Sequence, residues 1–227
     1  MYDLLELSLL RDIGISSLRW LIGLSLGSIA GLILSIICAW DKGQKTISPL
    51  VYFLRSIPIL GLVPLIQWYF GPKELGKVLL ISWAVIFPIW ISFVSVLQRN
   101  EDQDSALAML GPNSSAPFKL RHFFLPKLGA AFISGINLAV GLGWLAVVAS
   151  ELVGTFNKGF WAGGLGYRLF DAFNTQNDWR SGLLCIALFG VLGLTTSWLW
   201  SSIAPYLYSI TTGGDARYVA RHTRSRN

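Results

Sequence analysis

The sequence has few of the residues from which enzymes build reactive sites. Its 227 residues include two cysteines, Cys38 and Cys185, and two histidines, His122 and His222. The cysteines fall within apolar runs and the histidines within basic segments, so neither a disulfide framework nor a zinc site is indicated. The apolar runs also contain no paired acids and no serine beside a base, which are the groups an intramembrane enzyme needs. We therefore expect this chain to be no enzyme and to hold no cofactor or metal.

Charged residues are also scarce. They make up 13% of the chain, whereas 53% is hydrophobic, and the mean hydropathy is +0.57. One soluble core cannot bury so much apolar surface, so the composition predicts an all-α, polytopic protein whose first partner is the lipid bilayer. The formal net charge of +6 is typical of Lys- and Arg-rich cytoplasmic loops in such proteins, and we do not interpret it as a nucleic-acid surface.

About five stretches are apolar and long enough to cross a bilayer. Residues 1–19 mix leucines with charges and predict an interfacial helix. Residues 20–212 then form the transmembrane domain, and residues 213–227 form a basic cytoplasmic tail. The predicted spans are 20–40, 47–70, 78–98, 128–150 and 181–203, with an inner loop at 99–127 and an outer loop at 154–180. Placing 99–127 inside puts 11 of the 18 Lys and Arg residues inside when Arg55 is counted with them, which predicts an outer amino terminus and an inner carboxyl terminus.

Glycine recurs every fourth residue in the first span, at Gly23, Gly27 and Gly31. Such a stripe allows another helix backbone to approach closely, either within this chain or in a second subunit.

Proline interrupts the second span. Pro58 and Pro64 follow Arg55, which predicts a kinked or broken helix. Broken helices in transporters tend to lie along cavities, so Arg55 and Pro58 are candidate pathway residues. Alternatively, Arg55 extends to the cytoplasmic interface.

The following turn, GPKELGK at 71–77, has the spacing of a phosphate-binding loop, but Val78 replaces the required hydroxyl and no soluble strand precedes it.

Polar residues mark the fourth span and the outer loop. Asn137 lies in mid-span and either bonds a neighbouring helix or lines the pathway. Glu151 ends the span and must face polar atoms or water, so we predict a structural role at the outer mouth and count it among the candidate pathway or gate residues. The loop 154–180 is rich in glycine and aromatic residues and predicts a short outer helix, either a gate that includes Tyr167 or an interfacial anchor.

The inner loop 99–127 carries signals of its own. Gly111 and Pro112 separate two short helical stretches, and the second carries apolar side chains, Phe118 and Leu120 among them, between basic flanks. A short amphipathic helix of this kind is suited to insert into a groove on another protein.

This loop resembles that of binding-protein-dependent ABC importer permeases. Their EAA motif reads Glu-Ala-Ala, three residues, Gly, about nine residues, an aliphatic residue, one more residue and Leu-Pro. It corresponds here to Ser105, Ala106, Leu107, Gly111, Leu125 and Pro126. Residues 54–71, 75–88, 139–154 and 164–167 also fit, and they are most similar to the subgroup that serves nitrate, sulfonate, taurine, bicarbonate and some pyrimidine precursors. Many members carry a further amino-terminal span, so we expect the sequence to begin after it.

The resemblance implies a type I ABC importer permease fold with a cytoplasmic coupling helix, in the cell inner membrane. It implies separate ATPase subunits that bind the ATP, a solute-binding protein, a second permease copy and a small anionic solute. The implied ATPase-coupling residues are Ser105, Ala106, Leu107, Leu110, Gly111, Phe118, Leu120, Leu125 and Pro126. The chain departs from the motif at Ser105 and Leu107 and in a spacing about two residues longer. An ATPase-independent channel or membrane scaffold derived from such a permease is therefore the alternative.

Overall fold

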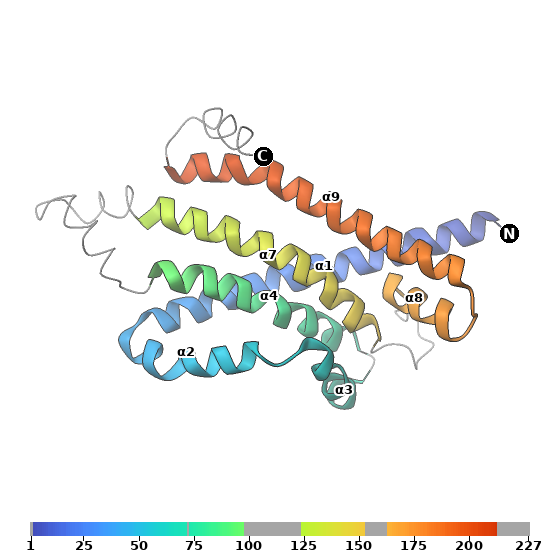
Figure 1. The fold of residues 1–227 in the computed structure, drawn as a ribbon, viewed down its shortest axis with the longest axis horizontal. Coiled ribbons are helices and arrows are strands. Elements are labelled where there is room, and N and C mark those ends of the chain that lie inside the picture. Colours follow the sequence, from blue (N-terminus) through green and yellow to red (C-terminus); the bar gives the residue numbers. More distant parts are fainter. Residues whose placement is uncertain (1, 72, 98–123, 153–162, 213–227) are drawn as a thin grey trace, which may run out of the picture.

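The computed structural model describes residues 2–71, 73–97, 124–152 and 163–212, and the regular structure within these ranges is helical. The helices are α1 (Tyr2–Ala39), α2 (Asp41–Arg55), α3 (Ile59–Phe70), α4 (Glu74–Leu97), α7 (Leu125–Leu152), α8 (Leu165–Asn174) and α9 (Trp179–Thr212) (Figure 1).

Four of the described helices are long and apolar enough to cross a membrane. The qualifying segments are Leu7–Ala39, Glu74–Leu97, Leu125–Glu151 and Trp179–Ile210. A fifth candidate consists of Gly43–Arg55 and Ile59–Phe70, which meet at an angle of 92°. The prediction of an all-α chain with about five spans is confirmed, including the break in the second span.

Three boundaries differ from those expected. The interfacial helix predicted at 1–19 is continuous with the first span in α1, because that stretch contains good helix formers and because Asp12 and Arg19 find partners in the fold. Residues 41–46, which the predicted spans leave as a connection, begin α2. Helix α9 continues past residue 203, the predicted end of the last span, and through Pro205 to Thr212.

The glycine stripe of α1 packs against α4. A Cβ atom added at Gly27 would lie 2.6 Å from the Ser82 carbonyl oxygen, and one at Gly31 would lie 2.6 Å from the Ile86 carbonyl oxygen. Gly23 meets Ile81 still more closely. Close packing within the chain, one of the two interpretations of the stripe, is therefore confirmed.

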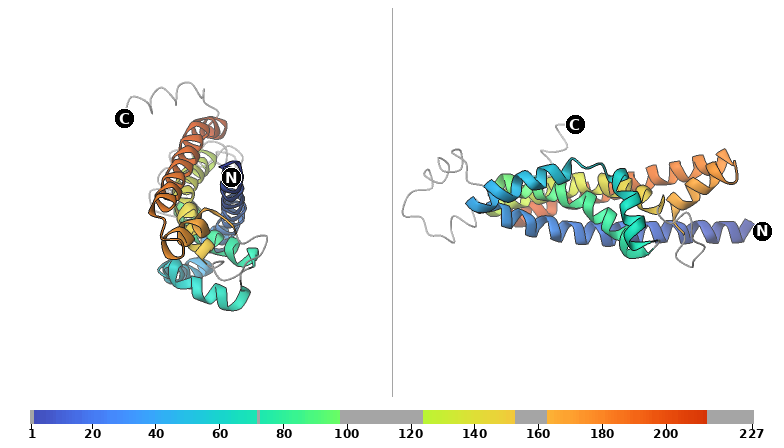
Figure 2. Two further views of the ribbon diagram at one scale, coloured as in Figure 1. Left: turned by 90° about the vertical axis from the view of Figure 1, so that its right-hand side faces the viewer. Right: turned by 90° about the horizontal axis from the view of Figure 1, so that it is seen from below.

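The centre of the bundle lies where α1, α4 and α7 meet. Val85 and Ile89 of α4 pack there with Ala139 and Val140 of α7. Trp20 of α1 stacks on Trp144 of α7, with ring centroids 5.2 Å apart. In two directions of view, α9 lies at one edge of the bundle and α2 at the other, with α4 and α7 between them (Figure 2).

The helix ends gather at two ends of the bundle. The first residues of α1 and α4, the last of α7, helix α8 and the start of α9 lie at one end, which we call the outer end. The turn between α1 and α2, the last residues of α4, the start of α7 and the end of α9 lie at the other (Figure 1). Asp178 caps α9 at the outer end, because it accepts the Ser181 hydroxyl at 2.5 Å and the Arg180 N–H at 3.1 Å. The Ser181 hydrogen bond holds the pKa of Asp178 below its ordinary value.

Candidate functional site

A group of charged and polar side chains meets at the outer end of the bundle. Its members come from α1, α4, α7 and α8. They are Asp12, Ser16, Arg19, Glu74, Lys77, Glu151 and Arg168, and we call them the outer ionic cluster.

Arg19 is the centre of this cluster. Its Nε and Nη2 atoms donate to the two carboxylate oxygens of Glu74, each at 2.6 Å, which is the bidentate geometry that makes such pairs strong. Its Nη1 atom donates to Glu151 at 2.9 Å and to the Gly163 carbonyl oxygen at 2.6 Å. Lys77 donates to Glu74 at 3.0 Å. Arg19, Lys77 and Glu151 are all buried. The two cations and the two carboxylates balance, so the fold has no net charge to bury here.

The cluster caps helix α8 with side chains from other helices. Residues at the start of a helix have backbone N–H groups without intrahelical partners, and Gly164, at the N-cap, has no side chain to offer them. The Gly164 N–H donates to Asp12 of α1 at 3.3 Å and the Leu165 N–H to Ser16 at 2.9 Å. The Gly166 N–H donates to Glu151 of α7 at 2.6 Å. Helix α8 is therefore positioned by α1 and α7 rather than by its own residues.

Glycine is required in this loop for two reasons. Gly164 has a φ of +128°, a conformation that residues with a Cβ rarely adopt, and a Cβ there would collide with the Glu151 carboxylate. A Cβ on Gly166 would lie 2.9 Å from Glu151 Oε2. The carboxylate can thus reach the backbone only because both positions lack a side chain.

The expectation that Glu151 faces polar atoms is met, because its two oxygens accept from Arg19, Ser16 and Gly166. Sequence reasoning missed most of its partners. It placed Arg19 in a separate interfacial helix and considered Lys77 only as part of a turn. A signal was present, since Asp12, Ser16 and Arg19 follow one another at spacings of four and three residues and so share one helix face. Tyr167, the predicted gate residue, lies half-buried in the first turn of α8.

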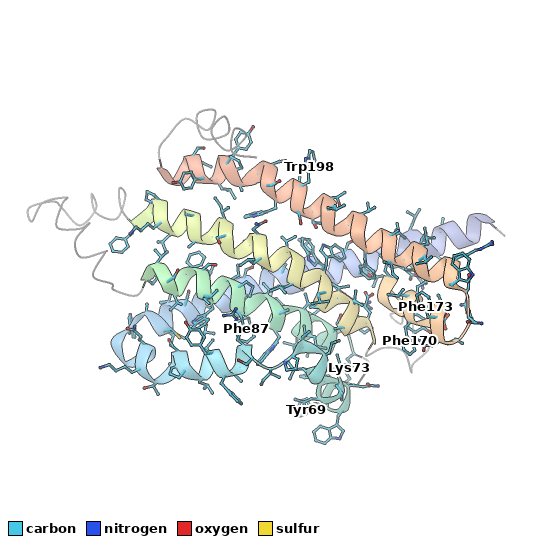
Figure 3. All side chains as sticks on the ribbon, in the orientation of Figure 1. Tyr69, Lys73, Phe87, Phe170, Phe173 and Trp198 are labelled. Carbon is cyan, nitrogen blue, oxygen red and sulfur yellow. The ribbon has the colours of Figure 1, made fainter. Side chains whose placement is uncertain are left out.

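A groove of about 380 Å³ lies where the broken α2–α3 segment meets α4 and α7. Arg55 and Pro58, both candidate pathway residues, are exposed in it. Its other lining residues are apolar: Ile57, Ile59, Trp83, Ala84, Phe87, Pro88, Ile91, Leu138, Leu142 and Leu145. Phe87 projects from α4 on the side of α2 (Figure 3) and packs edge-on against Trp83. We call this feature the Arg55 groove.

Asn137 does not join Arg55. It is exposed in a second groove, of about 460 Å³, between α7 and α9, beside Ser134, Ser201 and Tyr208. Within the described ranges Asn137 has no hydrogen-bond partner, so the structure shows no bond to a neighbouring helix. The two candidate pathway residues thus line different grooves.

Most of the proposed ATPase-coupling residues, from Ser105 to Leu120, lie outside the described residues. Leu125 and Pro126 are described, and they form the first turn of α7, where a proline is tolerated. Leu125 is exposed at the inner end of the bundle.

The fold defines a multi-pass helical membrane protein with a polar cluster at one end and grooves along α7. A family model for the binding-protein-dependent transport system inner membrane component matches residues 23–207. The chain belongs to this family, as the resemblance of its loop implied, and it is an inner-membrane protein.

Individual relatives are named as transport permeases. A putative aliphatic sulfonates transport permease protein of Bacillus subtilis is 29% identical over 185 residues, which cover 78% of this chain and 63% of that protein. A nitrate import permease protein of Synechococcus elongatus is 27% identical over 84% of this chain and 68% of its own length. A bicarbonate transport system permease protein of the same species is 28% identical over 76% of this chain and 60% of its own length. The chain thus spans less than two thirds of the first and third of these relatives.

Proposed function

We propose that this chain is the membrane permease subunit of an ATP-driven importer, that it forms the solute pathway and that it couples to a separate ATPase. The observation that carries the proposal is the match at 23–207, because it runs through the inner loop as well as the spans on both sides. The partial motif from Ser105 to Pro126 supports the loop as the contact with the ATPase.

The exposed face of α7 supports a second permease copy as the partner that closes the pathway. This face carries Ser134, Asn137 and Gly141 at helical spacing. The side chains of Ser134 and Asn137 are exposed, and a Cβ added at Gly141 would meet no atom of the described residues within 4 Å. Polar groups at membrane depth are costly against lipid and favour protein or water. Two copies facing each other along α7 would enclose such groups.

The solute is a small anion, by analogy with relatives whose names specify sulfonates, nitrate and bicarbonate. A solute-binding protein delivers it at the outer end. Closure of the ATPase pair on ATP moves the inner loops, and the helices rock as rigid bodies about the pathway.

Charge substitutions in the inner loop test the coupling. Leu110→Asp and Phe118→Asp each place a carboxylate in an apolar docking contact, and we expect about a tenfold or larger loss of copurifying ATPase, since buried apolar anchors dominate such interfaces. Gln103→Asp adds the same charge in the polar stretch of the loop and serves as the control. Retention of the ATPase by both Leu110→Asp and Phe118→Asp would contradict the proposal.

Ser105, which replaces the motif glutamate, supports the alternative of an ATPase-independent channel or scaffold. Uptake into proteoliposomes that contain the copurified complex distinguishes the two. The importer requires ATP hydrolysis for accumulation against a gradient, whereas a channel only equilibrates the solute.

A further inference from the structure

Among the described residues, Arg55 is a charge of the broken second span to which the fold supplies no counter-charge. Its side chain is exposed in the Arg55 groove and pairs with no carboxylate of the described residues. This differs from Arg19, Lys77 and Arg168, each of which has an acidic partner in the outer ionic cluster.

Taking the start of α2 as the inner boundary of the hydrocarbon layer places Arg55 within that layer. Arg55 ends the 15-residue helix α2, about 21 Å from the start of that helix at the inner end. The hydrocarbon core is about 30 Å thick, so this distance exceeds the length of an arginine side chain that extends to the inner surface. Extension to the cytoplasmic interface, the alternative considered from the sequence, is therefore disfavoured.

No acidic residue of the described spans lies at this depth. The sequence has no Asp or Glu from residue 43 to 73, from 75 to 97, from 125 to 150 or from 179 to 212. The nearest acids along the chain are Asp41, at the inner end, and Glu74, which already holds Arg19 and Lys77 at the outer end. A second copy of the chain has the same sequence and adds no carboxylate at this depth.

The walls of the groove offer no compensation either. Phe87, Pro88 and Leu142 are among its apolar lining residues. A cation facing lipid there is costly, and such residues instead face a water-filled cavity or a partner of opposite charge. Within the described part of the chain, water and mobile anions in the groove are what remains to solvate and balance this cation.

We propose that Arg55 is the specificity-determining charge of the pathway, a fixed cation that concentrates anionic solutes in the outer half of the membrane and excludes cations. The inference rests on the proposed transport function and names the property of the solute that this site selects. The backbone break keeps Arg55 at the groove, because α2 ends at that residue and α3 turns aside by 92°.

Charged thiol reagents test this proposal without any partner protein. Ile57→Cys places a thiol in the groove, and the chain is held in lipid nanodiscs so that both faces are accessible. The quantity measured is the ratio of the modification rate by an anionic methanethiosulfonate reagent to the rate by its cationic counterpart. We expect this ratio to be about tenfold higher in Ile57→Cys than in the double variant that also carries Arg55→Gln, because a fixed charge in a low-dielectric groove focuses counter-ions. Arg55→Lys should retain the preference, and high salt should reduce it. The native chain, whose cysteines are buried, gives the background rate.

Two results would overturn the proposal: no modification of the thiol by either reagent, or an anion preference that persists in Arg55→Gln. If Ile57→Cys does not fold, Leu142→Cys, on the opposite wall of the groove, supplies the same readout. Failure of the transport proposal is distinguishable, because an anion preference in the groove together with no copurifying ATPase indicates the channel alternative.

Discussion

Glu151 shows how one residue joins four parts of the chain. Its carboxylate accepts hydrogen bonds from Ser16 and Arg19 of α1 and from the Gly166 backbone of α8, and through Arg19 it is linked to Glu74 of α4. It is buried, and a buried carboxylate is tolerated only when its oxygens are satisfied and its charge is balanced. The residue thus acts on structure through pairing.

Glu151→Gln should lower thermal stability markedly. The amide keeps the size of the side chain but leaves the cluster with an excess of positive charge, and breaking a buried ion pair by removing one partner costs about 3 kcal/mol or more. Thermal unfolding in detergent measures the loss. Asp171→Asn is the matched control, because the Asp171 carboxylate bonds only the exposed Gln176 side chain among the described residues, so the substitution should shift the midpoint little. Equal midpoints for the two variants would show that the cluster does not stabilise the fold.

At the scale of elements, the contact between α1 and α4 depends on the absence of side chains. The predicted stripe of glycines lies along this contact. Helix α4 leaves no room for a Cβ at any of the three positions, because its backbone lies close to Gly27 and Gly31 and its Ile81 side chain lies close to Gly23. Helices in membranes associate through such close packing, because lipid offers little hydrophobic driving force between them.

Gly27→Ala should destabilise the bundle by about 1–3 kcal/mol, the usual cost of overpacking, since its Cβ would lie 2.6 Å from the Ser82 carbonyl oxygen and from Val85. Gly14→Ala on the same helix is the control. A Cβ at Gly14 meets nothing within 4 Å, so alanine there should be neutral or stabilising by up to about 1 kcal/mol. A lower unfolding midpoint for Gly27→Ala together with an unchanged or higher midpoint for Gly14→Ala confirms the contact. A stabilising Gly27→Ala would contradict it.

At the scale of the whole molecule, the two ends of the bundle differ in character. Helix α3 turns away from α2 at the outer end, has no buried residue and exposes Trp68 and Tyr69. Aromatic residues of this kind are enriched at membrane surfaces. Figure 3 shows Tyr69 pointing away from the bundle at the end that also holds Phe170 and Phe173 of α8.

Labelling from one side of the membrane tests the predicted orientation. In intact spheroplasts, an impermeant maleimide should react with Tyr69→Cys, whereas Trp40→Cys, at the turn between α1 and α2, should react only after permeabilisation. Both positions are 74% exposed in the structure, so a difference in labelling between them reports the side of the membrane and not burial in the fold. The opposite pattern would place the loop 99–127 outside and would remove it from reach of a cytoplasmic ATPase.

Much of the fold follows from patterns along the sequence. The long apolar runs, the break near Pro58 and the glycine stripe are local or periodic signals, and each corresponds to a feature of the structure. The ends of helices were predicted less well, because polar residues such as Asp41 and Arg19 are compatible with both a helix and a turn, and their neighbours in space decide between them.

The candidate sites divide in the same way. Composition and the order of motifs determined on their own that the chain is a membrane permease and that Arg55, Asn137 and Glu151 are unusual at their depths. Only the tertiary structure decided that Glu151 and Arg19 satisfy each other, that Asn137 and Arg55 line separate grooves and that Arg55 alone of these charges lacks a described partner. The physical reason is that a buried charge is stabilised by groups far away in sequence, and the free energy of that pairing depends on distances that no linear pattern contains.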